Sequence, residues 1–194
     1  MAEEVEGQYF LADFESLGQV RRLAQDLEGL EHIHALGNNA GGIFDGPSTT
    51  ADGFERTWQV NVVAPFLLTS LLRDKLRADN ANVVQTASLA NFLMSKFDLS
   101  DPTTLEHFSP ERAYGNAKLA NILFTAELQR RHGADVLAVV VAIGHENQRA
   151  AGRARGLAGG RLPQAGRQHA AHDDFVHPVG GDAGVFQGAG DGRR

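Results

Sequence analysis

Short apolar runs alternate with long amphipathic stretches in this chain, and this alternation limits its fold more than any other feature. Four runs have the length and composition of buried strands: residues 8–12, 32–36, 82–87 and 136–142. Three longer stretches place apolar side chains at helical spacing: residues 15–28, 50–77 and 111–132. Strands that alternate with helices are typical of a parallel sheet packed against helices. We therefore predict an α/β fold.

The residue pattern also predicts details of these elements. The last strand is nearly continuous in Val and Ala, which is typical of a strand covered on both faces. For the helix at 50–77, Thr49, Thr50 and Asp52 are alternative N-caps, and Pro65 is predicted to kink it. The predicted buried positions of the first two helices are Leu17, Val20, Leu23 and Leu27, then Phe54, Trp58, Val62, Phe66 and Leu67.

The composition of the chain changes near Ile143. Residues 143–194 hold twelve of the 22 glycines and seven of the arginines, and neither strand nor helix period persists there. Such a segment buries too little apolar surface to offset the entropy cost of ordering it. We therefore divide the chain into a folded domain, residues 1–142, and a low-order Gly/Arg/Ala-rich tail, residues 143–194. A reading-frame change in a G- and C-rich gene would produce this composition, and the transcript sequence would test that hypothesis.

Charge and cysteine content exclude several classes of protein. The net charge of −6 argues against a nucleic-acid or membrane-surface binder. With no cysteine, the chain has neither disulfides nor thiolate metal ligands. The histidines lack further ligands at convincing spacing, so we expect no metal site. The acidic start is unlike a signal peptide, and the apolar run 136–143 is too short to span a bilayer. We expect a soluble, cytoplasmic protein.

Tyr114 and Lys118 lie four residues apart in the predicted helix 111–132, so their side chains are adjacent on one face. An ammonium beside a phenol favours the phenolate and lowers the pKa of the tyrosine toward neutral pH. Such a tyrosine can act as a general acid or base. The same pattern also fits a half-exposed aromatic ring beside a solvated lysine.

Three further motifs precede this pair in a fixed order: Asn38-Asn39-Ala40-Gly41, then Asn61, then Ser88. Together with Tyr114-x-x-x-Lys118, the array resembles the short-chain dehydrogenase/reductase family. The continuation from Lys118 to Phe124, Lys-Leu-Ala-Asn-Ile-Leu-Phe, resembles its retinol-dehydrogenase-like branch. The resemblance covers roughly residues 8–142. It implies a Rossmann-like, doubly wound parallel sheet, NAD or NADP as cofactor, and interconversion of an alcohol and a ketone or aldehyde on a small apolar substrate.

The resemblance also implies catalytic roles for four residues. Tyr114 would exchange a proton with the substrate oxygen, and Lys118 would tune Tyr114 and hold the nicotinamide ribose. Ser88 would hydrogen-bond the substrate carbonyl, where charge develops. Asn61 would anchor a water that connects Lys118 to solvent. Taken alone, Ser88 is an ordinary residue at a strand end and Asn61 an ordinary polar residue on a helix.

Cofactor contacts follow from the same resemblance. Asp13 would accept a hydrogen bond from the adenine amino group, and Asn38 would lie nearest the ribose. Ala40 and Gly41 would bring backbone and small side chains against the cofactor. As alternatives, Asp13 can cap the helix that starts after it, and residues 38–41 can form a tight turn.

Parts of the family pattern are not recognisable in the sequence. We find neither the first two strands with their Gly-rich phosphate loop nor the last strand. In the family's strand order, 3-2-1-4-5-6-7, the strand before Asn38 would then have an unpaired edge. We therefore expect a partial sheet, weak NAD(P) binding and impaired activity. The alternative is a catalytically inactive fragment, or a remnant that forms homo-oligomers through its two long helices.

Overall fold

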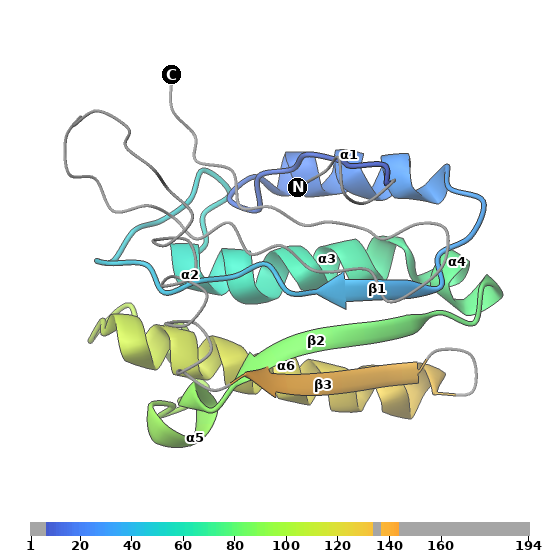
Figure 1. The fold of residues 1–194 in the computed structure, drawn as a ribbon. Helices are drawn as coiled ribbons and strands as arrows, with labels where there is room; N and C mark the ends of the chain where they lie inside the picture. The colour runs from blue at the N-terminus through green and yellow to red at the C-terminus, as the bar shows by residue number, and fades with distance from the viewer. Residues whose placement is uncertain (1–6, 134–136, 144–194) are drawn as a thin grey trace, which may run out of the picture.

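The computed structural model describes residues 7–133 and 137–143, and it contains a three-stranded parallel sheet (Figure 1). The strands stand in the order β1-β2-β3, so each lies beside the next along the chain. Their bounds are Ala35–Asn38 for β1, Asn82–Ser88 for β2 and Leu137–Ile143 for β3. In register, Ala35 is opposite Asn82, which is opposite Leu137. The predicted α/β fold with a parallel sheet is confirmed. Of the tail predicted at 143–194, Ile143 is the last residue of β3, and residues 144–194 lie outside the described residues.

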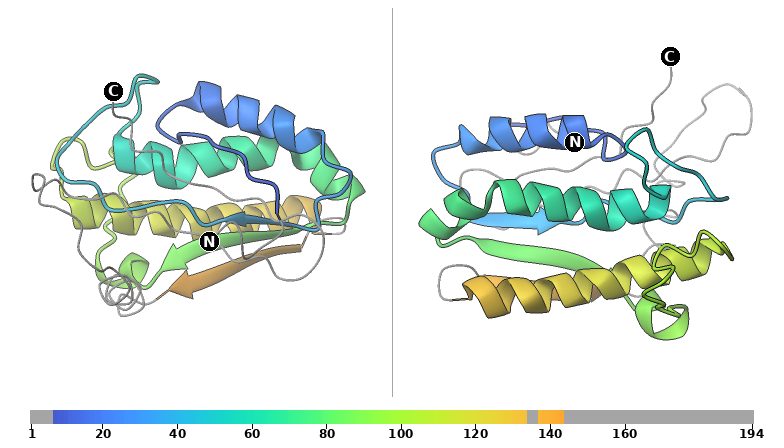
Figure 2. Two further views of the ribbon diagram at one scale, coloured as in Figure 1. Left: turned by 45° about the horizontal axis from the view of Figure 1, so that its top comes forward. Right: turned by 180° about the vertical axis from the view of Figure 1, so that it is seen from behind.

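Helices α3, α4 and α6 lie on one face of the sheet, and α1 packs beside α3 (Figures 1 and 2). The second long helical stretch is a series of four segments, and a short helix follows β2. The bounds are α1 Leu17–Glu28, α2 Arg56–Trp58, the π-helical turn η1 Gln59–Val63, α3 Ala64–Leu71, α4 Arg73–Ala78, α5 Ala90–Leu93 and α6 Pro110–His132.

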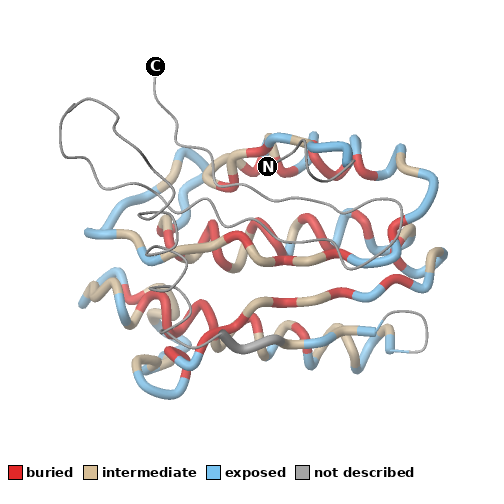
Figure 3. Tube along the Cα trace, in the orientation of Figure 1, coloured by how far each residue is buried: buried red, intermediate tan, exposed pale blue. Residues whose placement is uncertain are grey.

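The apolar core lies where α1, the α3–α4 helices and the sheet meet, and Figure 3 shows the buried positions along these elements. The four predicted buried positions of α1 are confirmed, since each is at most 8% exposed. Full burial of a side chain of this size contributes roughly 1.5–3 kcal/mol. The main contributors from the sheet side and the facing helices are Ile33, Leu36, Leu68, Leu72 and Leu76.

The strand predicted at residues 8–12 is wrong. The segment is irregular, and the side chains of Tyr9 and Leu11 are 68% and 87% exposed. A strand needs a neighbour to satisfy its backbone donors and acceptors, and within the described residues no strand pairs with this segment. Phe14, just after it, is buried and carries the contact with the core instead.

The strand predicted at residues 32–36 begins three residues later than expected, at Ala35. Asp79 explains the shift, because its carboxylate accepts a hydrogen bond from the Ile33 amide at 2.8 Å and lies 3.4 Å from His32 Nδ1. The Ile33 amide therefore bonds to a side chain and not to a neighbouring strand.

The helix predicted at residues 50–77 begins later and contains an irregular turn. Its N-cap is Glu55, whose carboxylate accepts from the amides of Thr57 and Trp58, so the cap predicted at Thr49, Thr50 or Asp52 is wrong. Asp52 accepts from the Leu17 amide at the start of α1 instead. The irregular turn is the π-helical turn η1 at Gln59–Val63, and the kink predicted at Pro65 stays a prediction, with Pro65 in the first turn of α3. Pro65 has no N–H, so the first turn of a helix tolerates it.

The buried stripe of this helix is offset from the prediction. Phe54 and Phe66 are 39% and 51% exposed. Residues four apart lie on one face of a helix. The residues that face the core have this spacing: Val60, Ala64, Leu68, Leu72 and Leu76.

The prediction that the last strand is covered on both faces is also wrong for its described side chains. In β3, Leu137 and Val139 are 54% and 38% exposed, whereas Ala138 and Val140 are less accessible. The exposed pair points away from the helix layer, because neighbouring strand residues alternate between faces.

Candidate active site

The candidate residues gather at the carboxyl ends of β1 and β2. Asn38 and Ser88 are the last residues of these two parallel strands, so they end at the same edge of the sheet. Helix α6 begins beside this edge (Figure 1). Its start is fixed by Ser109, whose hydroxyl accepts from the Arg112 amide, and by Pro110 in the first turn. This start places Tyr114 and Lys118 in the early turns of α6.

Tyr114 and Lys118 are both buried, with exposures of 5% and 3%. The Lys118 ammonium lies 5.3 Å from the centre of the Tyr114 ring. It also donates a hydrogen bond to the carbonyl oxygen of Thr86 at 3.1 Å. The alternative of a half-exposed ring beside a solvated lysine is therefore wrong, and the two groups form a buried pair against β2.

Asn61 lies in the π-helical turn η1 and is 1% exposed. Its amide nitrogen donates to the carbonyl oxygen of Thr57 at 2.8 Å and to that of Gly42 at 3.0 Å. Its other polar atom, Oδ1, is buried and has no hydrogen-bond partner among the described residues. Single π-helical turns occur often at functional sites, where they disturb the regular backbone pairing. Asn61 thus links the loop after β1 to η1. Its Oδ1 is a hydrogen-bond acceptor without a partner among the described residues.

Gly41 brings the loop after β1 into contact with this group. A Cβ atom at position 41 would collide with Asn61 Oδ1 and lie 3.3 Å from Lys118 Nζ. Only glycine allows the backbone to approach this closely. The structure therefore brings Gly41, Asn61 and Lys118 together, as the sequence order of the motifs predicts.

Ser88 is 6% exposed and ends β2. Its hydroxyl oxygen accepts a weak hydrogen bond from the Ala90 amide at 3.3 Å, at the start of α5. A serine hydroxyl has one donor and two acceptor positions, so this bond leaves the donor available.

The described side-chain bonds of Asn38 and Asp13 go to residues outside the group around Lys118. The Asn38 amide nitrogen donates to Thr69 Oγ1 at 2.9 Å, and that hydroxyl donates to the Pro65 carbonyl, so the side chain points into the helix layer. Ala40 is buried two residues further on. The Asp13 carboxylate accepts from the Glu15 amide at 2.8 Å and so closes a turn just before α1.

Thr86 is a site residue that sequence reasoning missed. Its carbonyl holds Lys118, and its hydroxyl donates to Asn39 Oδ1 at 2.8 Å, which links β2 to the loop after β1. The available signal was a hydroxyl residue inside an apolar run, two positions before Ser88. Asn116, between Tyr114 and Lys118, was also missed and is fully buried.

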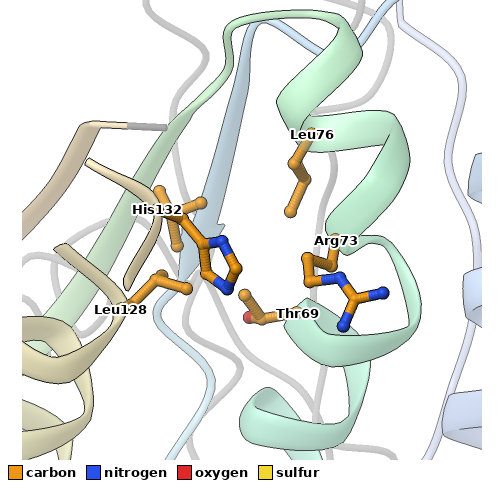
Figure 4. A pocket seen from close by; sticks show the side chains of 6 residues that line it. Thr69, Arg73, Leu76, Leu128 and His132 are labelled. Carbon is orange, nitrogen blue, oxygen red and sulfur yellow. The ribbon is translucent and has the colours of Figure 1, made fainter. Parts of the chain in front are cut away.

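One pKa shift with a defined cause lies away from this site. Hydrogen bonds from Arg130 and Arg131 lower the pKa of the exposed Glu127 to about 2, near the end of α6. A crevice at the same end of the helix layer is lined by six residues, with His132 and Leu128 on one side and Thr69, Arg73 and Leu76 on the other (Figure 4). None of them is a predicted site residue.

Two absences concern the described part of the chain alone. Across residues 7–133 and 137–143, no cluster of three or more His, Asp, Glu or Cys residues is arranged to hold a metal ion. In the same two ranges, no helix has the length and apolar character needed to cross a bilayer.

The fold and the site geometry agree with the family that the sequence indicates. The short chain dehydrogenase family matches residues 1–147, and the chain belongs to this family. Retinol dehydrogenase 11 of Mus musculus is 41% identical over 123 residues, which cover 62% of this chain and 38% of that protein. This likeness confirms the resemblance to the retinol-dehydrogenase-like branch. The chain spans less than half the length of the curated relatives it matches.

Two solved structures show the same fold. An uncharacterized protein from Mycobacterium paratuberculosis is 32% identical, with a TM-score of 0.61 over 78% of this chain and 58% of that one. A short-chain dehydrogenase from Sphingobium yanoikuyae, solved in complex with NADPH, has a TM-score of 0.53 at 20% identity and covers 69% of this chain and 49% of that one. The second likeness shows the fold alone.

Proposed function

We propose that this chain acts as an NAD(P)-dependent oxidoreductase that interconverts an alcohol and a ketone or aldehyde. The observation that carries the proposal is the buried pair of Tyr114 and Lys118, held against the carbonyl of Thr86. Burying an ammonium group costs free energy unless an interaction partner compensates for it. Beside a phenol, it stabilises the phenolate that remains after a proton is given away.

The proposed chemistry needs a proton at the substrate oxygen. When bound, the nicotinamide would supply or accept hydride at the substrate carbon. Tyr114 donates its phenolic proton to the oxygen in the direction of reduction and takes it back in the direction of oxidation. Ser88 donates a hydrogen bond to the same oxygen from the end of β2, because its hydroxyl proton is available there. Hydride and proton together convert C=O into CH–OH, so the step is balanced.

The described residues fit one part of such a cofactor. Lys118 would hold the ribose hydroxyls beside the nicotinamide, and the backbone of Ala40 and Gly41 would lie along the cofactor. The close approach of Gly41 to Lys118 supports this arrangement. The orphaned Asn61 Oδ1 supports a water-mediated path from Lys118 to solvent, because a buried acceptor without a partner favours an ordered water. Asp13 as adenine contact and Asn38 as ribose contact stay predictions.

A small apolar alcohol or carbonyl compound remains the proposed substrate. The name of the relative, retinol dehydrogenase 11, supports an apolar alcohol. Leu89, Phe92 and Leu93, which follow Ser88, are 49%, 80% and 81% exposed and could contact such a molecule. Nucleic acid is not a proposed partner, and the cytoplasmic location stays a prediction.

Self-association through the long helices is a further part of the proposal. The rings of Phe66 on α3 and Phe124 on α6 meet at 5.3 Å, and Phe66 and Leu123 are more than half exposed. This surface also favours the alternative function, an oligomerising protein without catalysis. Sedimentation of the wild type and of Leu123→Lys would measure it, and unchanged mass would contradict self-association through this surface.

Calorimetric titration with NADH and NADPH, together with reduction of retinal, tests the oxidoreductase proposal. Nucleotide binding with turnover that Tyr114→Phe abolishes would support it. A folded chain that binds neither nucleotide, or turnover that survives Tyr114→Phe, would contradict it. A folded chain that binds neither nucleotide and forms a stable oligomer would favour the alternative function, an oligomerising protein without catalysis.

A further inference from the structure

The residues after α5 run across the amino end of α6 toward α2. We call residues 94–105 the crossing segment. At its beginning, the Ser95 hydroxyl donates to the carbonyl of Asn91 in α5. In its middle, the ring of Phe97 lies 6.4 Å from that of Trp58 in α2. The segment therefore contacts both α5 and α2.

One side chain of α6 holds the crossing segment at two points. Asn116 Oδ1 accepts from the Lys96 amide at 3.0 Å. Its Nδ2 donates to the Pro102 carbonyl at 3.2 Å and, more weakly, to the Lys96 carbonyl at 3.5 Å. Asn116 is 0% exposed, so these backbone groups are its partners in place of water. A buried amide whose donor and acceptor both bind the backbone of one loop is a specific anchor.

The neighbouring residue on α6 makes this anchoring possible. A Cβ atom at Gly115 would lie 2.8 Å from the Ser95 amide nitrogen, 3.0 Å from the Met94 carbonyl carbon and 3.1 Å from the Ala90 carbonyl oxygen. All three are backbone atoms, which cannot move aside as a flexible side chain can. Gly115 thus lets the segment lie directly on the helix, one residue after Tyr114.

These contacts connect the anchor to the candidate site. α5 begins two residues after Ser88, the crossing segment follows α5, and both rest on the two residues that follow Tyr114. Figure 1 shows α5 at the arrowhead end of β2, near the amino end of α6. Phe92 and Leu93, which α5 presents to solvent, lie four and three residues before the anchored Lys96. A shift of Lys96 would therefore move this apolar surface relative to Tyr114.

We propose that Asn116 is a positioning residue that fixes the crossing segment on α6 and thereby sets the apolar wall of the substrate site. The proposal of a substrate wall rests on the proposed oxidoreductase function, whereas the anchoring does not. Asn116 touches neither cofactor nor substrate in this account, and it acts through residues 89–102.

Hydrogen exchange tests the anchor without any activity. In Asn116→Ala, exchange at the Lys96 amide and its neighbours is expected to rise about tenfold, because a buried hydrogen bond is lost. The matched control is Asn121→Ala, at an asparagine further along α6 that is also buried, with 3% exposure, and has no described bond to the crossing segment. Asn116→Ser also removes these bonds but keeps a polar atom that can bond its own helix backbone, so the same rise in exchange is expected, and it serves if the alanine variant fails to fold. If exchange rose equally in Asn121→Ala, or did not rise in Asn116→Ala, the proposed anchoring by Asn116 would be wrong.

Kinetics test the substrate wall. With NADPH as cofactor, Asn116→Ala is expected to raise the KM for retinal about tenfold. For acetaldehyde, both kcat and KM are expected to change by less than about twofold, because only the long apolar substrate needs the wall. A purely structural role would lower kcat for both substrates alike. An equal effect on the two aldehydes would overturn the wall but leave the oxidoreductase function standing. If the wild type reduces neither aldehyde, the proposed function fails, and the exchange result still decides the anchor.

Discussion

Lys118 and Tyr114 lie one helical turn apart on α6, and the Lys118 ammonium is 5.3 Å from the centre of the Tyr114 ring. The spacing is set by the helix period, but the usefulness of the pair depends on burial. The bond to the Thr86 carbonyl directs the ammonium toward β2. In this surrounding of low dielectric, the ammonium acts on the phenol more strongly than it would in water.

Tyr114→Phe is expected to lower turnover by at least about a hundredfold, because the proposed proton donor is lost and general acid catalysis contributes roughly that much. Nucleotide affinity is expected to stay within a factor of about two, since Lys118 remains. Steady-state kinetics and calorimetry measure the two effects. The matched control is Tyr9→Phe, because Tyr9 is the other tyrosine of the sequence and is exposed. Equal loss in both variants would rule out a special role for Tyr114.

Gly41→Ala is expected to destabilise the fold by about 1–3 kcal/mol, because the added methyl group overpacks the contact with Asn61 and Lys118. The next residue provides the control: a Cβ at Gly42 would meet only the Phe44 ring, at an ordinary 3.7 Å. Gly42→Ala is expected to change stability by no more than about 1 kcal/mol. Urea unfolding of the two variants gives the comparison, and similar stabilities would contradict the close approach at position 41.

The sequence predicted those parts of the site that depend on local spacing. Residues four apart on a helix meet whatever surrounds them, so the proximity of Tyr114 and Lys118 was predictable. The meeting of Gly41, Asn61 and Lys118 was indicated only by the order of family motifs. Thr86 and Asn116 contribute a backbone carbonyl and bonds to a distant loop, and neither contact leaves a periodic signal in the sequence.

The errors in the predicted fold have a common cause, which is tertiary context. Residues 8–12 have strand composition, but no described strand pairs with them. The start of β1 moves because Asp79, more than forty residues away, binds the Ile33 amide. Phe54 and Phe66 are apolar yet exposed, since the helix face that meets α1 and the sheet is defined by Val60 and the residues that follow at intervals of four.

Glu55→Ala is expected to lower the free energy of unfolding by about 1–2 kcal/mol, because the helix that carries Asn61 loses its N-cap. The buried Glu55 carboxylate accepts from Thr57 at 2.8 Å and Trp58 at 2.7 Å, so two backbone donors would be left without partners. Thermal and urea unfolding measure the loss. Glu28→Ala, at the exposed end of α1, removes a carboxylate without a described bond and is the control. An equal effect of both changes would show that charge alone matters.

Asp79 gives the fold a defined sensitivity to acid. The Ile33 amide lowers the pKa of this carboxyl first, with His32 and Lys75 adding to the effect. The folded state therefore holds the carboxylate to a lower pH than the unfolded state, whose aspartate titrates near pKa 3.9. The stabilisation is complete above the unfolded pKa. It is lost as the pH falls through the folded pKa, because the unfolded state takes up the proton first.

Asp79→Asn is thus expected to lower the free energy of unfolding by about 1 kcal/mol at neutral pH and to have little effect once the wild-type carboxyl is itself protonated. Urea unfolding of both proteins at about pH 7, 5 and 3 measures the difference. His32→Gln separates the causes: since the Ile33 amide contributes most, this variant is expected to keep most of the wild-type acid sensitivity. If His32→Gln removed the sensitivity as fully as Asp79→Asn, the ion pair and not the amide bond would hold the strand start in place.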